Sequence, residues 1–159
     1  MLEIEALKPG NVHVFADGHG MTVHDFIKSA EATALVIAEP NLTVGERILL
    51  AVEATQREVG TNTNLGIILL CAPLIHTALM LERITPQALQ ESLALTLAKL
   101  TIEDAQLTAK AILLAKPAGL GASKMHDVNV PISVTLLALM QAAAEYDRIA
   151  WQYANNFAD

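Results

Sequence analysis

Helix signals dominate the pattern of polar and apolar positions in this chain. Strict alternation of apolar and polar residues, which is typical of half-buried strands, is nearly absent over any useful length. Threonines followed three residues later by an acidic side chain have the spacing of capping boxes, and they predict helices over residues 23–38 and 44–58. The two pairs are Thr22 with Asp25 and Thr43 with Glu46. The pattern therefore predicts an all-α fold.

The second half of the chain shows the same kind of helix starts. Thr85 before Pro86, and Thr101 before an acidic pair, are typical N-cap positions, and a proline at 131 predicts a further start. Four leucines at spacings of four, four and three form a stripe that a helix must bury: Leu89, Leu93, Leu97 and Leu100. Residues 65–81 are the most apolar stretch, and we expect them to form the most buried helix, at the centre of a compact multi-helix domain.

Three polar segments interrupt this apolar helical pattern: residues 8–21, 59–64 and 116–130. They are rich in Gly, Asn, His, Lys or Asp, which predicts loops between the helices. Because loops on a rigid scaffold are the usual place for binding and catalytic residues, we expect the chemistry of the protein in these three loops. No repeat of fixed period is present, so we expect residues 1–159 to form a single helical domain.

The composition argues against several classes of protein. Of the 159 residues, 53% are apolar and only 17% are charged, which excludes a disordered chain. So apolar a chain needs a large core or apolar contacts with other protein, as in a homo-oligomer. A net charge of -7 without any basic run argues against nucleic acid as a partner and against binding to an anionic membrane surface.

Two further features bear on the compartment. The apolar stretch over residues 65–81 contains Pro73 and His76 and is shorter than the roughly 20 residues of a membrane span, so we expect no membrane insertion. Cys71 is the only cysteine and cannot form an internal disulfide. Both features fit a cytoplasmic protein.

The first two loops offer donors that suit a nucleotide or phosphate. Lys8 and Asn11 flank a Pro-Gly turn that presents side chains and backbone N–H groups to one spot. Asn62, Thr63 and Asn64 come directly before an apolar helix, whose N-terminal N–H groups attract anions. The alternatives are a simple helix stop for the first loop and N-capping by Asn62 or Thr63 for the second. We expect both loops to line one pocket.

The third loop combines two glycines with Ser123, Lys124 and Asp127 and is suited to a second anionic group. Asp127 is the candidate catalytic residue, because a carboxylate beside Lys124 and His126 can take a proton or bind Mg²⁺. The alternative is a surface loop in which Asp127 caps the next helix. Asp147 is a second candidate metal ligand, and equally a solvated charge or an ion-pair partner on a helix.

Some enzyme classes have characteristic motifs that this chain lacks. Gly-x-Ser-x-Gly, His-Glu-x-x-His and paired cysteines do not occur, which excludes the corresponding serine hydrolases, zincins and zinc ribbons. The residues alone thus predict a helical domain with three polar loops that binds a phosphorylated ligand. An enzyme, a non-catalytic nucleotide- or CoA-binding module and an oligomeric scaffold are all compatible with this prediction.

Several short segments occur in the kind, order and spacing of one known family. They are Lys8-Pro9-Gly10-Asn11-Val12, Met21-Thr22 with Asp25-Phe26 and Ser29-Ala30, Thr61-Asn62-Thr63-Asn64-Leu65-Gly66, Asp127-Val128, and Ala143-Ala144 with Asp147, Ile149-Ala150 and Gln152-Tyr153. Over most of its length the chain resembles the triphosphoribosyl-dephospho-CoA synthase family.

This resemblance implies an all-helical enzyme that breaks the N-glycosidic bond of ATP. The triphosphoribosyl group would pass to the 2′-hydroxyl of 3′-dephospho-CoA or a related acceptor, with release of adenine. Such a transfer needs charge screening on the triphosphate, a base for the hydroxyl and stabilisation of an oxocarbenium-like transition state. The resemblance thus implies ATP with Mg²⁺ and a dephospho-CoA-like acceptor as ligands, bound by the polar loops.

Two features depart from the family pattern. Asn64 stands where the citrate-lyase members tend to carry His, which indicates a divergent branch and leaves both dephospho-CoA and a related acceptor open. Members of the family are also longer, so we expect the chain to be a fragment of a longer family domain.

Overall fold

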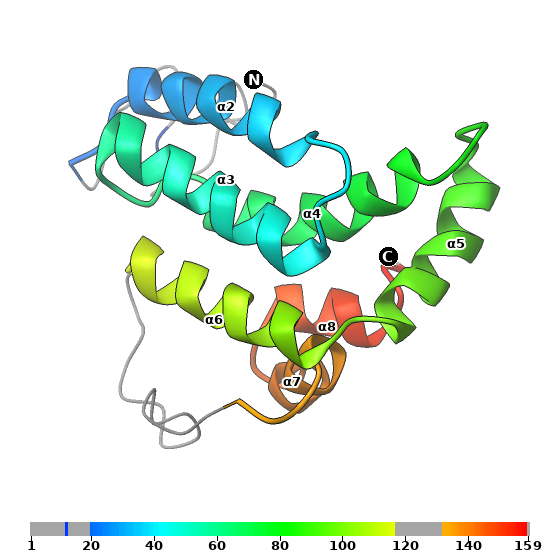
Figure 1. The fold of residues 1–159 in the computed structure, drawn as a ribbon. Coiled ribbons are helices and arrows are strands. Elements are labelled where there is room, and N and C mark those ends of the chain that lie inside the picture. The colour runs from blue at the N-terminus through cyan, green and yellow to red at the C-terminus, as the bar shows by residue number, and fades with distance from the viewer. Residues whose placement is uncertain (1–11, 13–19, 117–131, 159) are drawn as a thin grey trace.

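The computed structural model describes Val12, residues 20–116 and residues 132–158 of the chain. Figure 1 shows these residues as a set of packed helices, and no β-strand occurs among them. The helices are α2 (Val23–Ile37), α3 (Val44–Val59), α4 (Leu65–Leu79), α5 (Pro86–Ala98), α6 (Ile102–Ala115), α7 (Leu136–Ala143) and α8 (Arg148–Ala154). The predicted all-α fold is confirmed.

Threonine N-caps begin several helices at the predicted positions. Thr22, Thr43 and Thr101 each accept a hydrogen bond from the backbone N–H three residues later, and the acidic side chain at that position accepts one from the threonine N–H. These reciprocal bonds are complete capping boxes at the starts of α2, α3 and α6. Thr85 caps α5, with Pro86 as its first residue. Local side-chain chemistry therefore sets these helix starts.

The start of α7 corrects one prediction. This helix begins at Leu136, and the predicted start at Pro131 is wrong. Thr135 is the N-cap, because its hydroxyl accepts a hydrogen bond from the N–H of Ala138 at 3.3 Å. Residues 132–135 are not helical, and Pro131 itself lies outside the described residues. The N-cap hydrogen bond thus determines where the helix begins.

Helix α3, and not α4, is the central and most buried helix. It lies between α2 and α6 and also packs against α4 (Figure 1). More of its residues are buried than of α4, in which Ile67 and Leu79 are 45% and 51% exposed. The prediction that residues 65–81 form the most buried helix is therefore wrong. Burial depends on how many helices surround an element, and apolar content alone does not determine it.

The leucine stripe of α5 packs into the core as predicted. Leu93, Leu97 and Leu100 are buried, and Leu89 is partly buried. Leu93, Leu97 and Leu100 belong to one apolar cluster with residues of α3 and α4. Burial of a leucine side chain contributes about 1.5–3 kcal/mol to folding, so the stripe anchors α5 to the rest of the domain.

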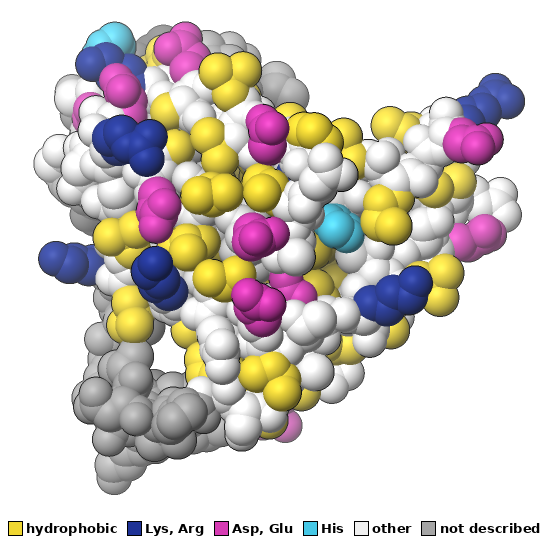
Figure 2. Space-filling view, in the orientation of Figure 1, with side chains coloured by type: hydrophobic (Ala, Val, Ile, Leu, Met, Phe, Trp, Pro, Cys, Tyr) yellow, Lys and Arg dark blue, Asp and Glu magenta, His cyan; other side chains and the backbone are white. Residues whose placement is uncertain are grey.

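The surface of the molecule carries charges of both signs. Figure 2 shows acidic side chains spread over the face drawn, with Lys and Arg side chains among them and no concentrated basic patch on that face. In the described ranges, no helix has both the length and the apolar character needed to cross a membrane.

Arg47 is a buried cation that binds the C-terminal end of α2. Its Nη1 donates to the carbonyl oxygens of Ile37 at 2.5 Å and Glu39 at 2.8 Å, and its Nη2 donates to that of Leu42 at 3.2 Å. The carbonyl of Ile37 at the end of α2 lacks a partner within the helix, and the guanidinium supplies one for it and for two carbonyls of the segment between α2 and α3. Burial lowers the pKa of Arg47, but a guanidinium stays protonated in proteins. The side chain therefore joins α2 to α3.

Helices α3 and α6 come into backbone contact at Gly45. A Cβ atom at this position would lie 2.6 Å from the Cα of Asp104 and 2.9 Å from its carbonyl oxygen. The N–H of Gly45 donates to Oδ1 of Asp104 at 2.7 Å, and the N–H of Thr101 donates to Oδ2 at 2.8 Å. One buried carboxylate thus accepts hydrogen bonds at the N-terminal ends of both helices, where negative charge is favoured.

We predict that Gly45→Ala lowers the free energy of unfolding by about 1–3 kcal/mol, the usual cost of overpacking a core. The added methyl group would meet backbone atoms of Asp104, which cannot move aside as a side chain does. Gly66→Ala is the matched control, since its Cβ would meet only Cδ1 of Ile149, at 3.2 Å. Urea denaturation measures both variants, and parental stability of Gly45→Ala would contradict this account of the contact.

Candidate functional site

Polar side chains from three parts of the chain meet at the start of α4. We call them the polar cluster; its members are Ser29 and Thr33 of α2, Thr55 of α3, and Thr63 and Asn64 of the loop over residues 60–64. Thr63 Oγ1 donates to Ser29 Oγ at 2.6 Å. The amide of Asn64 donates from Nδ2 to Thr33 Oγ1 at 3.1 Å and accepts at Oδ1 from Thr55 Oγ1 at 3.0 Å. The loop is thereby bonded to both helices.

The helical members of the polar cluster are buried and also bonded to one another. Ser29, Thr33 and Thr55 are 0%, 7% and 2% exposed. Ser29 Oγ donates to the carbonyl of Asp25 at 2.5 Å, Thr33 Oγ1 donates to the carbonyl of Ser29 at 2.6 Å, and the hydroxyl oxygens of Thr33 and Thr55 lie 3.1 Å apart. Buried polar groups are costly unless they are hydrogen-bonded, and these are. The cluster therefore holds the loop in one conformation without using a charge.

The loop itself makes a tight connection between α3 and α4. Gly60 ends α3 in the left-handed conformation, with φ 67°, which glycine adopts without strain. Asn62 then accepts a hydrogen bond at Oδ1 from the N–H of Leu65 at 3.1 Å. The sequence allowed two interpretations of this segment, anion binding and N-capping. The hydrogen bond to Leu65 shows that the Asn62 side chain caps the start of α4. Asn64 occupies the N-cap position, but its side chain makes no cap hydrogen bond and instead joins α2 to α3.

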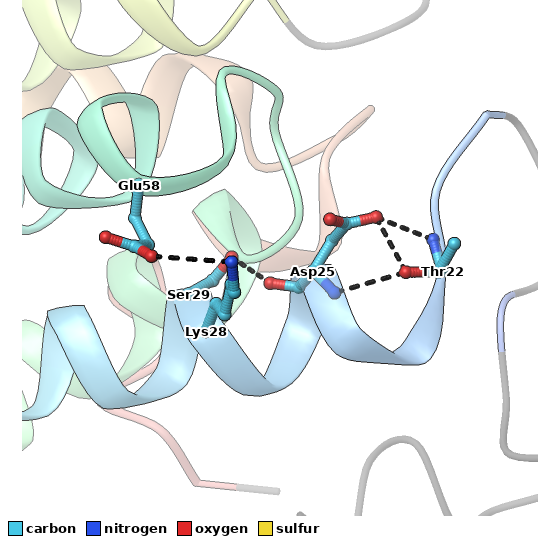
Figure 3. A network of polar contacts seen from close by, with 5 residues as sticks. All are labelled: Thr22, Asp25, Lys28, Ser29 and Glu58. Atoms are coloured by element: carbon cyan, nitrogen blue, oxygen red, sulfur yellow. Dashed lines mark hydrogen bonds and ion pairs between the residues drawn. The ribbon is translucent and has the colours of Figure 1, made fainter.

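Figure 3 shows the outer edge of this region, around the first turns of α2. Asp25 accepts at Oδ2 from the N–H of Thr22 at 2.8 Å and from its hydroxyl at 3.0 Å. The backbone hydrogen bond first, and then the hydroxyl, lower the pKa of Asp25, so this carboxyl is ionised at neutral pH. Lys28 Nζ lies 3.9 Å from Oε1 of Glu58, with side chains 42% and 47% exposed, and such a surface pair contributes little to stability.

An apolar groove begins at the polar cluster and runs between α2 and α4. We call it the α2–α4 groove; its volume is about 210 Å³. Thr33 and Asn64 of the polar cluster line it, together with Phe26, Ala30, Ala34 and Ile37 of α2 and Ile67, Ile68, Cys71 and Ile75 of α4. No charged side chain lines this groove. Cys71 is half-buried, and burial raises the pKa of its thiol.

The start of α8 lies beside the start of α4. Cδ1 of Ile149 approaches Gly66 so closely that a Cβ there would lie 3.2 Å away. Tyr153 Oη donates to the carbonyl of Leu69 at 2.6 Å, and burial is the main cause that raises the pKa of this phenol. Three segments that carry the family resemblance, residues 21–30, 61–66 and 143–153, therefore converge on the first turns of α4.

Asp147 lies at the N-terminal end of α8. Its Oδ1 accepts hydrogen bonds from the N–H groups of Ile149 at 2.7 Å and Ala150 at 2.9 Å, so the side chain acts as an N-cap. In the part of the chain that the structure describes, no three His, Cys, Asp or Glu side chains gather as metal ligands would. The metal-binding role of Asp147 stays a prediction.

The other predicted site residues lie outside the described residues: Lys8, Asn11, Ser123, Lys124 and Asp127. The expected shared pocket of the first two loops therefore stays a prediction, as does the role of Asp127. The structure adds Thr33 and Thr55, which the sequence analysis missed. From the sequence alone, a threonine inside an amphipathic helix is indistinguishable from an ordinary solvent-exposed polar residue. Only its hydrogen bond to a residue distant in the chain, here Asn64, identifies it as part of the cluster.

The chain matches one protein-family model. A protein-family model described as CitG, ATP:dephospho-CoA triphosphoribosyl transferase, matches residues 1–159. No curated protein and no solved structure matches the chain.

We predict that Thr33→Val lowers the free energy of unfolding by about 1–3 kcal/mol, because it leaves the partly buried Asn64 amide without one partner. Thr108→Val is the matched control: Thr108 is fully buried on α6, and its hydroxyl makes no hydrogen bond among the described residues. We expect this control to be neutral or stabilising. Urea denaturation compares the two, and equal effects would mean that the polar cluster contributes nothing specific.

Proposed function

Because the chain belongs to the ATP:dephospho-CoA triphosphoribosyl transferase family, we propose that it transfers the triphosphoribosyl group of ATP to the 2′-hydroxyl of 3′-dephospho-CoA or a closely related acceptor. In this reaction the bond between C1′ and N9 of ATP breaks, and a bond between C1′ and the acceptor oxygen forms. The acceptor hydroxyl loses its proton, and adenine leaves with a proton. The family match over residues 1–159 is the observation that carries this proposal.

The polar cluster supports a role of the loop over residues 60–64 as one wall of the nucleotide site. A carboxylate beside a triphosphate would repel it, whereas the polar cluster fixes the loop with hydroxyls and one amide. The loop therefore has a defined shape and adds no negative charge. We propose that Asn62, Thr63 and Asn64 form this wall. The further phosphate donors that we propose are Lys8, Asn11, Ser123 and Lys124.

A Mg²⁺ ion would supply charge neutralisation for the triphosphate. Magnesium in nucleotide sites usually takes one or two protein carboxylates and completes its coordination with phosphate oxygens and water. Asp147 supplies one such carboxylate at the N-terminal end of α8. We propose Asp127 and Asp147 as the carboxylates, with Asp127 also as the base that takes the hydroxyl proton.

We propose a non-catalytic binding module as the alternative function. The polar cluster contains no general acid or base, as hydroxyls and an amide do not take up a proton at neutral pH. A non-catalytic module that binds a nucleotide or a CoA-like ligand would need no such group. The two functions differ in whether the N-glycosidic bond of ATP is broken.

We predict that the purified protein, incubated with ATP, Mg²⁺ and dephospho-CoA, releases adenine and forms a triphosphoribosylated product in equal amounts. Mass spectrometry of the mixture measures both compounds. Omission of dephospho-CoA is the control, and it should stop adenine release. Binding of ATP without any release of adenine would instead support the non-catalytic module.

We predict that Asp127→Asn lowers kcat by about 10²–10⁴-fold, the usual contribution of a general base, with a smaller effect on ATP binding. Asp147→Asn is the matched variant, because Asn caps helices as well as Asp and so preserves the start of α8. We expect it to raise the Mg²⁺ concentration needed for half-maximal rate. Rate measurements at several Mg²⁺ concentrations test both roles, and an unchanged rate for Asp127→Asn would leave that residue no catalytic role.

A further inference from the structure

The α2–α4 groove differs chemically from the polar cluster at its end, and the proposed function gives none of its apolar residues a role. We propose that this groove binds the pantetheine arm of the acceptor and that the nucleotide end of the acceptor lies at the polar cluster. The inference rests on the proposed function, because it takes the acceptor to be dephospho-CoA or a close relative. It assigns to the groove a ligand class, an extended uncharged chain with two amide groups.

The lining of the groove excludes the charged parts of both substrates. Its ten residues carry no charge, and most of them are apolar. A phosphate placed there would lose its hydration without gaining a cation, which is strongly unfavourable. Of the chemical parts of ATP and dephospho-CoA, only the adenine rings and the pantetheine arm are uncharged and largely free of hydroxyls. The groove is therefore suited to one of these two.

The length of the groove favours the arm. Its lining extends along α4 from Asn64 to Ile75, which is roughly 16 Å at the helical rise of about 1.5 Å per residue. The pantetheine arm has about thirteen bonds between phosphorus and sulfur, the backbone length of roughly four residues, or about 15 Å when extended. An adenine ring would cover only part of this length and would leave most of the apolar lining in contact with water.

The polar end of the groove suits the amide groups of the arm. Asn64 Nδ2 has two hydrogens and Oδ1 has two lone pairs. Among the described residues, Thr33 takes one of these hydrogens and Thr55 one of the lone pairs. The second N–H and the second lone pair of the Asn64 amide can thus form hydrogen bonds with an amide group of the pantetheine arm at the mouth of the groove. This places the arm between the polar cluster and the aliphatic walls, with its thiol end toward Ile75.

Cys71 makes this proposal directly measurable, because the only cysteine of the chain lines the groove. The probes are S-methyl-dephospho-CoA and S-methylpantetheine, thioethers that do not consume a thiol reagent. Alkylation of Cys71 by iodoacetamide is followed by mass spectrometry at alkaline pH, since burial raises the pKa of the thiol. We expect both probes to slow alkylation in a saturable manner, and we expect adenosine to have no effect.

A pair of variants on α2 tests where the protection arises. Ala34 is exposed at the rim of the groove, so Ala34→Trp would fill the groove without entering the core. Leu35, the next residue, is 80% exposed and does not line the groove, which makes Leu35→Trp the matched control. We expect Ala34→Trp to abolish protection by S-methylpantetheine and Leu35→Trp to retain it. In the transfer assay, Ala34→Trp should raise KM for dephospho-CoA at least tenfold and leave KM for ATP unchanged.

Each result decides between occupants of the groove. Protection by adenosine and not by S-methylpantetheine would overturn the proposal in favour of the adenine ring. Protection that grows with protein concentration and without any probe would assign the groove to a second copy of the chain. Protection by S-methylpantetheine that Ala34→Trp abolishes supports the proposal even if the protein transfers no triphosphoribosyl group. If the protein catalyses the transfer but S-methylpantetheine does not slow alkylation of Cys71, the assignment of the groove would be overturned and the proposed function would stand.

Discussion

The buried carboxylate of Asp104 is the contact on which the packing of the helices around α3 depends. Its two oxygens accept hydrogen bonds from the first turns of α3 and α6, and the missing Cβ of Gly45 lets the two backbones touch at that point. A buried charge is costly unless donors surround it, and here the N–H groups of two helix ends supply them. With α6 held on one side, and α2 bonded on the other through Arg47, α3 becomes the helix against which α2, α4 and α6 pack.

From this central helix, the site is assembled by neutral hydrogen bonds. Thr55, on the last turns of α3, fixes the amide of Asn64, and the same amide reaches Thr33 on α2. Each bond contributes about 1 kcal/mol on its own, but together they leave the loop between α3 and α4 a single arrangement. In a protein with a net charge of -7, a binding surface for a polyphosphate must avoid further acidic groups, and the neutral polar cluster meets that requirement.

Two residues, Thr33 and Asn64, belong both to the polar cluster and to the α2–α4 groove. A polar and an apolar surface therefore meet at one amide, which is hydrogen-bonded to both α2 and α3. A substrate with a charged nucleotide end and an uncharged tail requires this kind of division, because neither part binds well in surroundings suited to the other. Helix α8 also approaches the start of α4, which brings a third segment of the family resemblance, residues 147–153, to the same place.

The sequence by itself determined the helix content and most of the helix starts, because capping is a local interaction between residues three apart in the chain. Thr22, Thr43, Thr85 and Thr101 cap helices as predicted, and the segments that converge at the site were recognisable from the family resemblance. The tertiary structure decided what depends on distant neighbours: that α3 is the central helix, that Arg47 is buried, and that Thr33 and Thr55 hold Asn64. Arginine and threonine on a helix are usually solvated, and the partners that bury these residues lie on other elements, so no local pattern can show them.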